Sequence, residues 1–171
     1  MDDQSCRCLL CAAPPGYPED AWDTRDRTTA ARIRRYGWTV TAVTGGPAYS
    51  TGLWHTFRAT EICVFGLPAR LGTRIADLVG NLLRDGDTLL DGERRDDVLT
   101  GYDVVVRAAR PDRCRGLFDA GLGFYRGTPV PITQIVWPDG AGRFPWEPGA
   151  GAGCRDSQPS LWLPGADAPY R

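Results

Sequence analysis

The segment from Glu61 to Leu83 constrains the fold more than any other part of the chain. Its first residues, Glu61 to Phe65, form a strand-like run that is apolar in its middle, as expected for a central strand. After Pro68, apolar residues recur at helical spacing: Leu71, Ile75, Leu78, Val79, Leu82 and Leu83. The pattern predicts a helix, ended by Asp85-Gly86, that packs one face on a sheet. We expect that face to bury Leu71, Ile75, Leu78 and Leu82.

The rest of the chain supplies further strands and helices around this unit. Strands are expected at residues 38–43, 48–53, 102–108 and 131–137, where β-branched and aromatic residues gather. A surface helix is expected from Asp23 or Thr24 to about Tyr36, ended by Gly37, and another from Pro111 to Tyr125. The charged stretch 87–100 is expected to be an exposed excursion. This order predicts an α+β fold with a mixed or mostly antiparallel sheet of about five strands, packed with two to three helices.

Length and composition favour one globular domain. The chain has 171 residues, 42% of them hydrophobic and 24% charged, which suits one hydrophobic core and argues against disorder. We expect an irregular cysteine-bearing segment at 1–21, a single α+β domain at 22–163 and a flexible tail at 164–171. Pro14-Pro15-Gly16 and Pro18 oppose regular structure in the first segment.

The charge of the chain excludes several classes of function. With 20 basic and 21 acidic side chains, it lacks the basic excess that nucleic acid or an anionic membrane would require. Every basic residue is an arginine, so Schiff-base chemistry and a P-loop lysine are excluded. The acidic start Met1-Asp2-Asp3 and the lack of a long apolar run predict a cytoplasmic protein. In that reducing compartment, thiols or metal ligands are expected in place of disulfides.

Three of the six cysteines form a candidate metal site near the start of the chain. Cys6, Cys8 and Cys11 are arranged as Cys-x-Cys-x-x-Cys, a spacing that suits zinc. A closed zinc site needs a fourth ligand, for which folding would have to bring in Cys154 or His55. The alternatives are a reactive dithiol or thiols without a role. Cys63 and Cys114 lie on apolar faces and are expected to be core residues.

Several segments, taken in order, resemble a known family. They are Ala48-Tyr49-Ser50-Thr51-Gly52-Leu53, Glu61 to Pro68, Gln134 to Asp139, Phe144 to Gly149 and Gln158-Pro159. In this order they are similar to the bacterial domain-of-unknown-function family 4262, over roughly residues 36 to 163. Members often begin with a Cys-x-x-Cys pair, which Cys8 and Cys11 match. The resemblance implies domain boundaries but no activity.

His55 is the only histidine, and therefore the only side chain whose unperturbed pKa lies near neutrality. It is expected at the end of the second strand, close in sequence to Arg58 and Glu61. In a catalytic site, His55 would be the general acid or base, Arg58 would hold an anion and Glu61 would orient one of them. The alternative is a packed histidine with Arg58 and Glu61 paired on the surface. Ser50 is a poor nucleophile candidate, because it lies within a strand.

Three hypotheses of function follow from these residues. The leading one is a domain that binds a small polar or anionic molecule, with Tyr49, Trp54, Arg58, Gln134 and Trp146 as ligand-binding candidates. A catalytic version of this hypothesis uses His55 and Glu61 in the manner just described. The second is a protein-interaction module that uses the charged stretch 87–97 or the aromatic tail. The third is a zinc-binding or thiol-redox protein centred on the N-terminal cysteines. Aromatic residues and Gln134 have an ordinary alternative role in packing.

Overall fold

The computed structural model describes residues 6–12 and 17–164. Residues 1–5, 13–16 and 165–171 lie outside the described part, and with them lie Pro14-Pro15-Gly16 and nearly all of the expected tail. Within the described part, no helix combines the length and the apolar character that crossing a membrane would demand.

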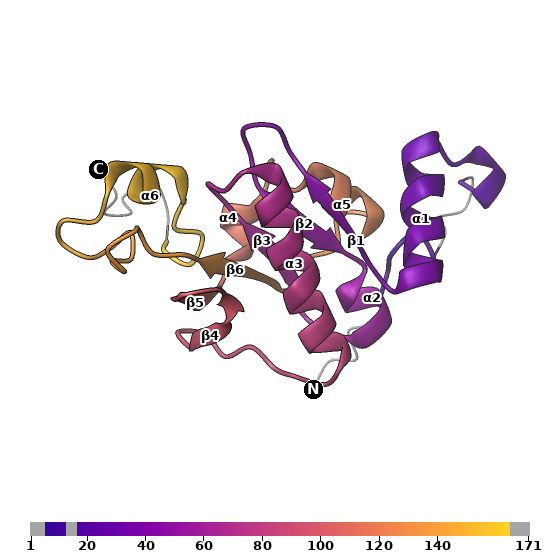
Figure 1. Ribbon diagram of the computed structural model, residues 1–171. Coiled ribbons are helices and arrows are strands. Elements are labelled where there is room, and N and C mark those ends of the chain that lie inside the picture. The colour runs from indigo at the N-terminus through magenta and orange to yellow at the C-terminus, as the bar shows by residue number, and fades with distance from the viewer. Residues whose placement is uncertain (1–5, 13–16, 165–171) are drawn as a thin grey trace.

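A six-stranded mixed sheet forms the centre of the molecule (Figure 1). Its strands are β1 (Thr39–Ala42), β2 (Ala48–Thr51), β3 (Glu61–Val64), β4 (Arg94–Leu99), β5 (Tyr102–Ala108) and β6 (Ile132–Val136). They lie in the order β1-β2-β3-β6-β5-β4. Only β3 and β6 pair in parallel, and the other neighbours are antiparallel. The α+β class and the mixed sheet are confirmed, with six strands where about five were expected.

The central strand β3 is buried on both faces of the sheet. Ile62 and Val64 point into one apolar cluster, whereas Cys63 points into the other. This alternation is the period-2 pattern of an extended strand. The expectation of an apolar central strand is therefore confirmed, and the two clusters give the domain a core on each side of its sheet.

Helix α3 (Ala69–Arg84) covers one face of the sheet, in front of the strands in Figure 1. Its buried arc consists of Gly72, Ile75, Ala76, Val79, Gly80 and Leu83. The small residues allow a close approach: a Cβ at Gly80 would lie 2.9 Å from the Trp38 ring. The prediction of which residues α3 buries was therefore partly wrong. Leu71 and Leu78 are 36% and 39% exposed, since the helix rests on its glycines and alanine and turns these leucines to its flank.

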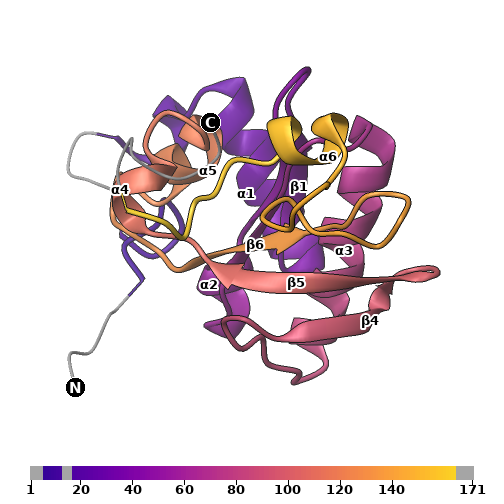
Figure 2. The same cartoon turned by 90° about the vertical axis from the view of Figure 1, so that its left-hand side faces the viewer.

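The opposite face is covered by shorter elements, as Figure 2 shows from the side. They are α1 (Thr24–Tyr36), α4 (Pro111–Cys114), α5 (Asp119–Phe124) and the segment around Leu9. Helix α1 matches its expected bounds. The Asp23 carboxylate accepts a hydrogen bond from the Asp26 amide at 2.7 Å, and Gly37 ends the helix at φ 90°.

Four local expectations need correction. The strand expected at 48–53 stops at Thr51, and α2 (Leu53–Phe57) follows it. The helix expected at 111–125 is divided into α4 and α5, with Gly116 between them at φ 76°. The charged stretch 87–100 contains edge strand β4, and the segment 1–21, expected to be irregular, contains a 3-10 turn at Glu19–Ala21. The sequence also contained no indication of α6 (Ala152–Ser157).

The corrected face of α3 gives a direct test by paired substitutions. Ile75 is 3% exposed, so Ile75→Ala should lower the free energy of unfolding by about 2–5 kcal/mol. Leu78→Ala on the exposed flank should cost less than about 1 kcal/mol. Urea denaturation of both variants measures the difference. Equal losses would contradict the assigned face.

Candidate metal centre

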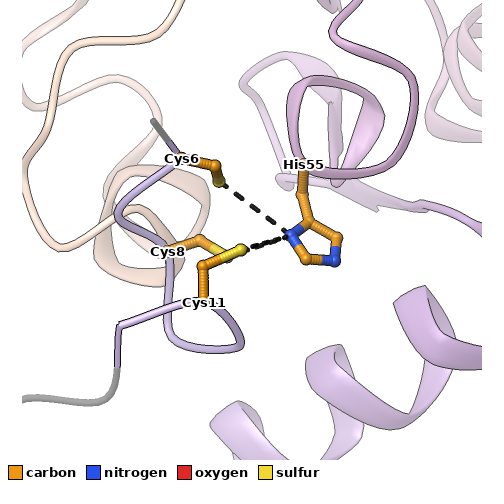
Figure 3. A group of neighbouring side chains, drawn as sticks. All are labelled: Cys6, Cys8, Cys11 and His55. Atoms are coloured by element: carbon orange, nitrogen blue, oxygen red, sulfur yellow. Dashed lines mark hydrogen bonds between the residues drawn. The ribbon is translucent and has the colours of Figure 1, made fainter. Parts of the chain in front are cut away.

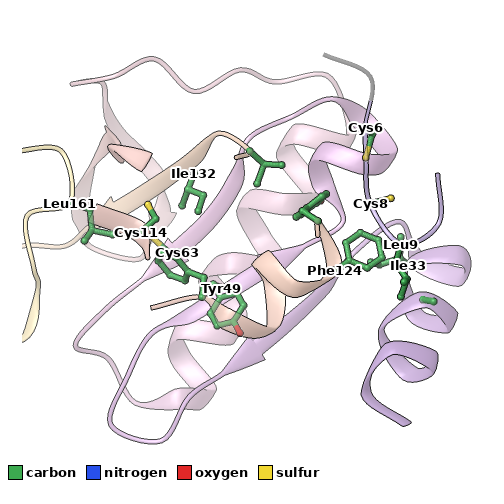
Figure 4. Close-up of a cluster of buried hydrophobic side chains, with 14 of the residues drawn as sticks. Cys6, Cys8, Leu9, Ile33, Tyr49, Cys63, Cys114, Phe124, Ile132 and Leu161 are labelled. Carbon is green, nitrogen blue, oxygen red and sulfur yellow. The ribbon is translucent and has the colours of Figure 1, made fainter. Parts of the chain in front are cut away.

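The N-terminal segment is a tight turn that is docked on the domain. The amides of Cys11 and Ala12 both donate to the Cys8 carbonyl, at 3.1 and 3.0 Å. The amide of Leu9 donates to the Phe124 carbonyl at 2.8 Å, and the Leu9 side chain is buried in the cluster that Figure 4 shows. The turn gathers the cysteines on one side, and Leu9 fixes the turn on the domain.

The facing side chain comes from α2, the short helix that follows β2. Gly52 separates the strand from the helix with φ 116°, in a region that disfavours any residue with a Cβ. A Cβ there would also lie 2.9 Å from the Gly37 carbonyl oxygen. This sharp turn places His55 at the middle of α2. His55 is thus helical, in contrast to the expected strand end.

Cys6, Cys8, Cys11 and His55 converge on one point (Figure 3). Their ligand atoms all lie within 4.8 Å of one another. The Nδ1 atom of His55 is 3.9, 3.2 and 3.3 Å from the sulfurs of Cys6, Cys8 and Cys11, respectively. His55 lies 44 to 49 positions after the three cysteines in the chain, so folding brings the histidine to them.

The four atoms fit a single tetrahedral metal ion. With Zn–S bonds of about 2.3 Å and Zn–N bonds of about 2.0–2.1 Å, tetrahedral geometry puts sulfur and nitrogen about 3.5 Å apart. The observed distances of 3.2 to 3.9 Å lie on both sides of that value. Three thiolates and one imidazole are also a ligand set that zinc prefers. The residues present therefore fit zinc.

The protonation of the ligands is set by burial. Burial raises the pKa of the Cys8 thiol to about 12 and raises that of Cys11, so these groups are neutral thiols at pH 7 when no metal is bound. Burial, followed by the nearby Arg58 charge, lowers the pKa of His55 and keeps its imidazole neutral. A neutral imidazole is ready to bind a metal, whereas the thiols must first release protons.

A buried carboxylate holds α2 in place. Glu61 on β3 is 3% exposed and accepts hydrogen bonds from the amides of Gly52 and Trp54, at 2.8 and 3.1 Å. The hydroxyls of Ser50 and Tyr125 donate to the same carboxylate. Burial raises the pKa of Glu61, against the opposite effect of these four donors. The carboxylate thus caps the beginning of the helix that carries His55.

Tyr125 completes this cap, and sequence reasoning gave it no site role. Its hydroxyl accepts from the Gly52 and His55 amides at 3.0 and 3.4 Å while it donates to Glu61. Burial and the adjacent carboxylate raise its pKa. In the sequence, Tyr125 was only the last residue of the helix expected from Pro111. Nothing in the local sequence indicates its contact with His55, which lies 70 positions earlier.

The ligand-binding candidates do not form one open site around His55. Tyr49 is buried against Phe118, and together with Glu61 it borders a cavity of about 10 Å³, room for about one water. Gln134 is fully buried, where its side chain bonds the Pro159 carbonyl and the Leu161 amide. Only Trp54 and Arg58 lie near His55: the guanidinium is 5.9 Å from the Trp54 ring centre and donates to the Trp54 carbonyl.

Cys154 lies away from the other metal candidates. Its thiol, on α6, donates to the Trp137 carbonyl at 3.4 Å and accepts from the Gln158 amide at 3.3 Å. Of the two candidates for the fourth ligand, the structure therefore brings His55 to the N-terminal cysteines and leaves Cys154 in the packing of α6. Cys63 and Cys114 are buried in the core cluster, as expected.

Trp146 borders a separate groove of about 940 Å³. Its ring is 43% exposed, stacks on Phe144 at 5.1 Å and meets Trp162 edge-on at 5.6 Å. Arg107 lies over Trp162, with its guanidinium carbon 5.1 Å from the ring centre. The loop that follows β6 is held by the Asp139 carboxylate, which accepts hydrogen bonds from the backbone amides of Ala141, Arg143 and Gly151.

Fold and site together define a small α+β domain with a three-thiol, one-imidazole cluster. A family model described as a domain of unknown function, DUF4262, matches residues 32–151. The chain therefore belongs to the DUF4262 family, which confirms the resemblance seen in the sequence. Neither the comparison with curated proteins nor that with solved structures gives a match. The matched region contains His55 and Glu61, while the three clustered cysteines precede it.

The cap on α2 predicts a measurable role for Glu61. Glu61→Gln should lower the free energy of unfolding by about 1–3 kcal/mol, because the amide group cannot accept from all four donors. Glu19→Gln, at an exposed ion pair with Arg34, is the control and should change stability little. Urea denaturation compares the two. A Glu61→Gln midpoint equal to wild type would contradict the capping role.

Proposed function

We propose that this domain binds one zinc ion through Cys6, Cys8, Cys11 and His55, and that the ion ties the N-terminal segment to the domain. The observation that carries the proposal is the convergence of four ligand atoms within 4.8 Å. Such a set is complete without water or substrate, as in structural zinc sites, whereas catalytic sites leave one position open. Structural stabilisation is therefore favoured over catalysis by the metal.

This proposal competes directly with the catalytic hypothesis for His55. A ring nitrogen that binds zinc has no free electron pair with which to accept a proton. Nδ1 is the atom that faces all three sulfurs, so zinc would occupy it. General acid–base chemistry by His55 with Glu61 gains no support from the geometry either, because the Glu61 carboxylate is buried and already bonded to four donors.

The ion would stabilise the fold by closing a loop between distant residues. Cys11 and His55 are 44 positions apart, and a cross-link over such a span removes unfolded-state entropy worth on the order of 4 kcal/mol. All six cysteines are free thiols. Free thiols fit the cytoplasmic location that we also propose, because a reducing compartment preserves thiolate ligands.

Metal analysis of the purified chain tests the proposal. Wild type prepared under reducing conditions should contain about one zinc per chain by mass spectrometry. Cys8→Ser and His55→Ala should each lose most of this zinc and melt at a lower temperature. Cys154→Ser is the matched control, since its thiol lies outside the cluster, and should keep its zinc. Metal-free wild type, or a His55→Ala variant that retains full zinc, would refute the assignment.

A second candidate function, binding of a small molecule, is supported by the groove beside Trp146. Its volume of about 940 Å³ is in the range of ligand sites, and it combines exposed indole surface with Arg107 and Arg155. The hypothesis of a protein-interaction module, which would use the charged stretch 87–97 or the aromatic tail, has less support at the charged stretch. Asp87 and Asp97 already pair with Arg95, at 2.5 and 2.7 Å.

An aromatic anion probes the groove. Anilinonaphthalene sulfonate should bind the wild-type chain and quench its indole fluorescence. Trp146→Ala should weaken that binding about fivefold, since stacking on an exposed ring contributes about 1 kcal/mol. Tyr36→Ala, which removes another exposed aromatic ring outside the groove, is the control. Equal affinity in the Trp146→Ala and Tyr36→Ala variants would argue against the groove as a binding site.

A further inference from the structure

We infer that the cysteine cluster is a peroxide-reactive site, in which Cys11 is oxidised first and then joins Cys8 in a disulfide that expels the metal. The inference rests on the proposed zinc site and adds a reaction to it. The chemical class of the reactant is a small hydroperoxide, such as hydrogen peroxide.

Unequal exposure of the three thiols identifies the one that reacts first. Cys6 and Cys8 are 6% and 0% exposed, whereas Cys11 is open to solvent. The remaining cysteines, Cys63, Cys114 and Cys154, are all buried. Susceptibility to oxidation follows thiolate character and exposure. Zinc would keep Cys11 as a thiolate, so this residue alone combines both properties.

Arg58 supplies a positive charge beside this thiolate. Three thiolates around one divalent ion leave a net charge of −1, which a nearby guanidinium offsets. Arg58 is held at this place by its bond to the Trp54 carbonyl at 3.1 Å and by the Trp54 ring. The guanidinium is close enough to Cys11 for the two charges to interact. A cationic neighbour of this kind favours the reactive form of a cysteine.

Cys8 is the partner that completes the reaction. The Cys11 amide donates to the Cys8 carbonyl at 3.1 Å, so the turn keeps the two residues close, and their sulfurs lie within 4.8 Å. A disulfide needs about 2.05 Å between sulfurs. Side-chain rotation within the turn can supply this change once the oxidised Cys11 sulfur no longer holds the metal.

The reaction balances without any further reactant. The Cys11 thiolate attacks one oxygen of hydrogen peroxide, the O–O bond breaks, and sulfenic acid and hydroxide form. The Cys8 thiolate then attacks the Cys11 sulfur, and a second hydroxide leaves as the S–S bond forms. Two electrons pass from the sulfurs to the peroxide, while the zinc ion stays divalent. Left with Cys6 and His55 alone, the ion dissociates.

The experiment treats the zinc-loaded full chain with hydrogen peroxide and follows zinc release with a chromogenic chelator. We expect one zinc released for one Cys8–Cys11 disulfide, identified by peptide mass spectrometry, and recovery of zinc binding after dithiothreitol and zinc are added. Cys11→His keeps a metal ligand that peroxide does not readily oxidise, so its zinc release should be at least about tenfold slower. Arg58→Gln should slow release several-fold. Cys154→Ser should behave as wild type.

The outcomes separate this inference from the proposed zinc site. Absence of zinc before peroxide is added would refute the zinc site and the inference together. Bound zinc that peroxide does not release would refute the inference alone. Release that is accompanied by oxidation of Cys63, Cys114 or Cys154, with Cys11 still reduced, would also overturn it. Should Cys11→His fail to load zinc, the peptide map of partly oxidised wild type still identifies the first cysteine to react.

Discussion

The rest of the structure depends on the buried carboxylate of Glu61. A carboxylate away from water requires donors, and it finds them on β2 at Ser50, on the turn into α2 and on Tyr125. These contacts join the sheet to both the short helix and the segment after α5. A five-residue helix has little stability of its own in water. Glu61 therefore explains why the chain after β2 forms α2, and why His55 faces the N-terminal segment.

The second constraint is the sheet itself, which separates the molecule into two unlike halves. One face carries the single long helix α3, whose glycines permit close packing on the strands. The other face is covered by α1, by the short helices α4 and α5 and by the turn around Leu9, so a larger share of its cover consists of irregular chain. Segments without regular structure have fewer backbone hydrogen bonds of their own. A cross-link therefore adds more to their stability than to that of a helix. The cysteine cluster lies on this less regular side, where a metal ion has the most to contribute.

Sequence reasoning succeeded where the signal is local and failed where tertiary contacts decide. The bounds of α1 and β5 follow from Asp23, Gly37 and a run of valines, and they were predicted closely. Strand β4 was missed because its residues, Arg94 to Asp97, are charged; an edge strand tolerates such residues, and pairing with β5 defines it. The three cysteines were identified from their spacing. The choice between His55 and Cys154 could not be made, because it depends on a helix that is held by Glu61 on the next strand and by Tyr125, 70 positions beyond His55.

The DUF4262 match separates the candidate metal ligands into two groups, one within the domain and one on the N-terminal turn. His55 and the Glu61 cap lie inside the matched region, whereas Cys6, Cys8 and Cys11 lie before it. The hydrogen bonds that hold α2, the helix of His55, come from residues 37 to 125, and none of them involves the cysteines or a metal. The domain therefore presents a preformed imidazole, and the N-terminal turn adds three thiols to it. A metal in this arrangement attaches a segment to a domain that is already folded. If zinc binds as proposed, its loss would free the turn at Leu9, while the sheet and the cluster under α3 would persist.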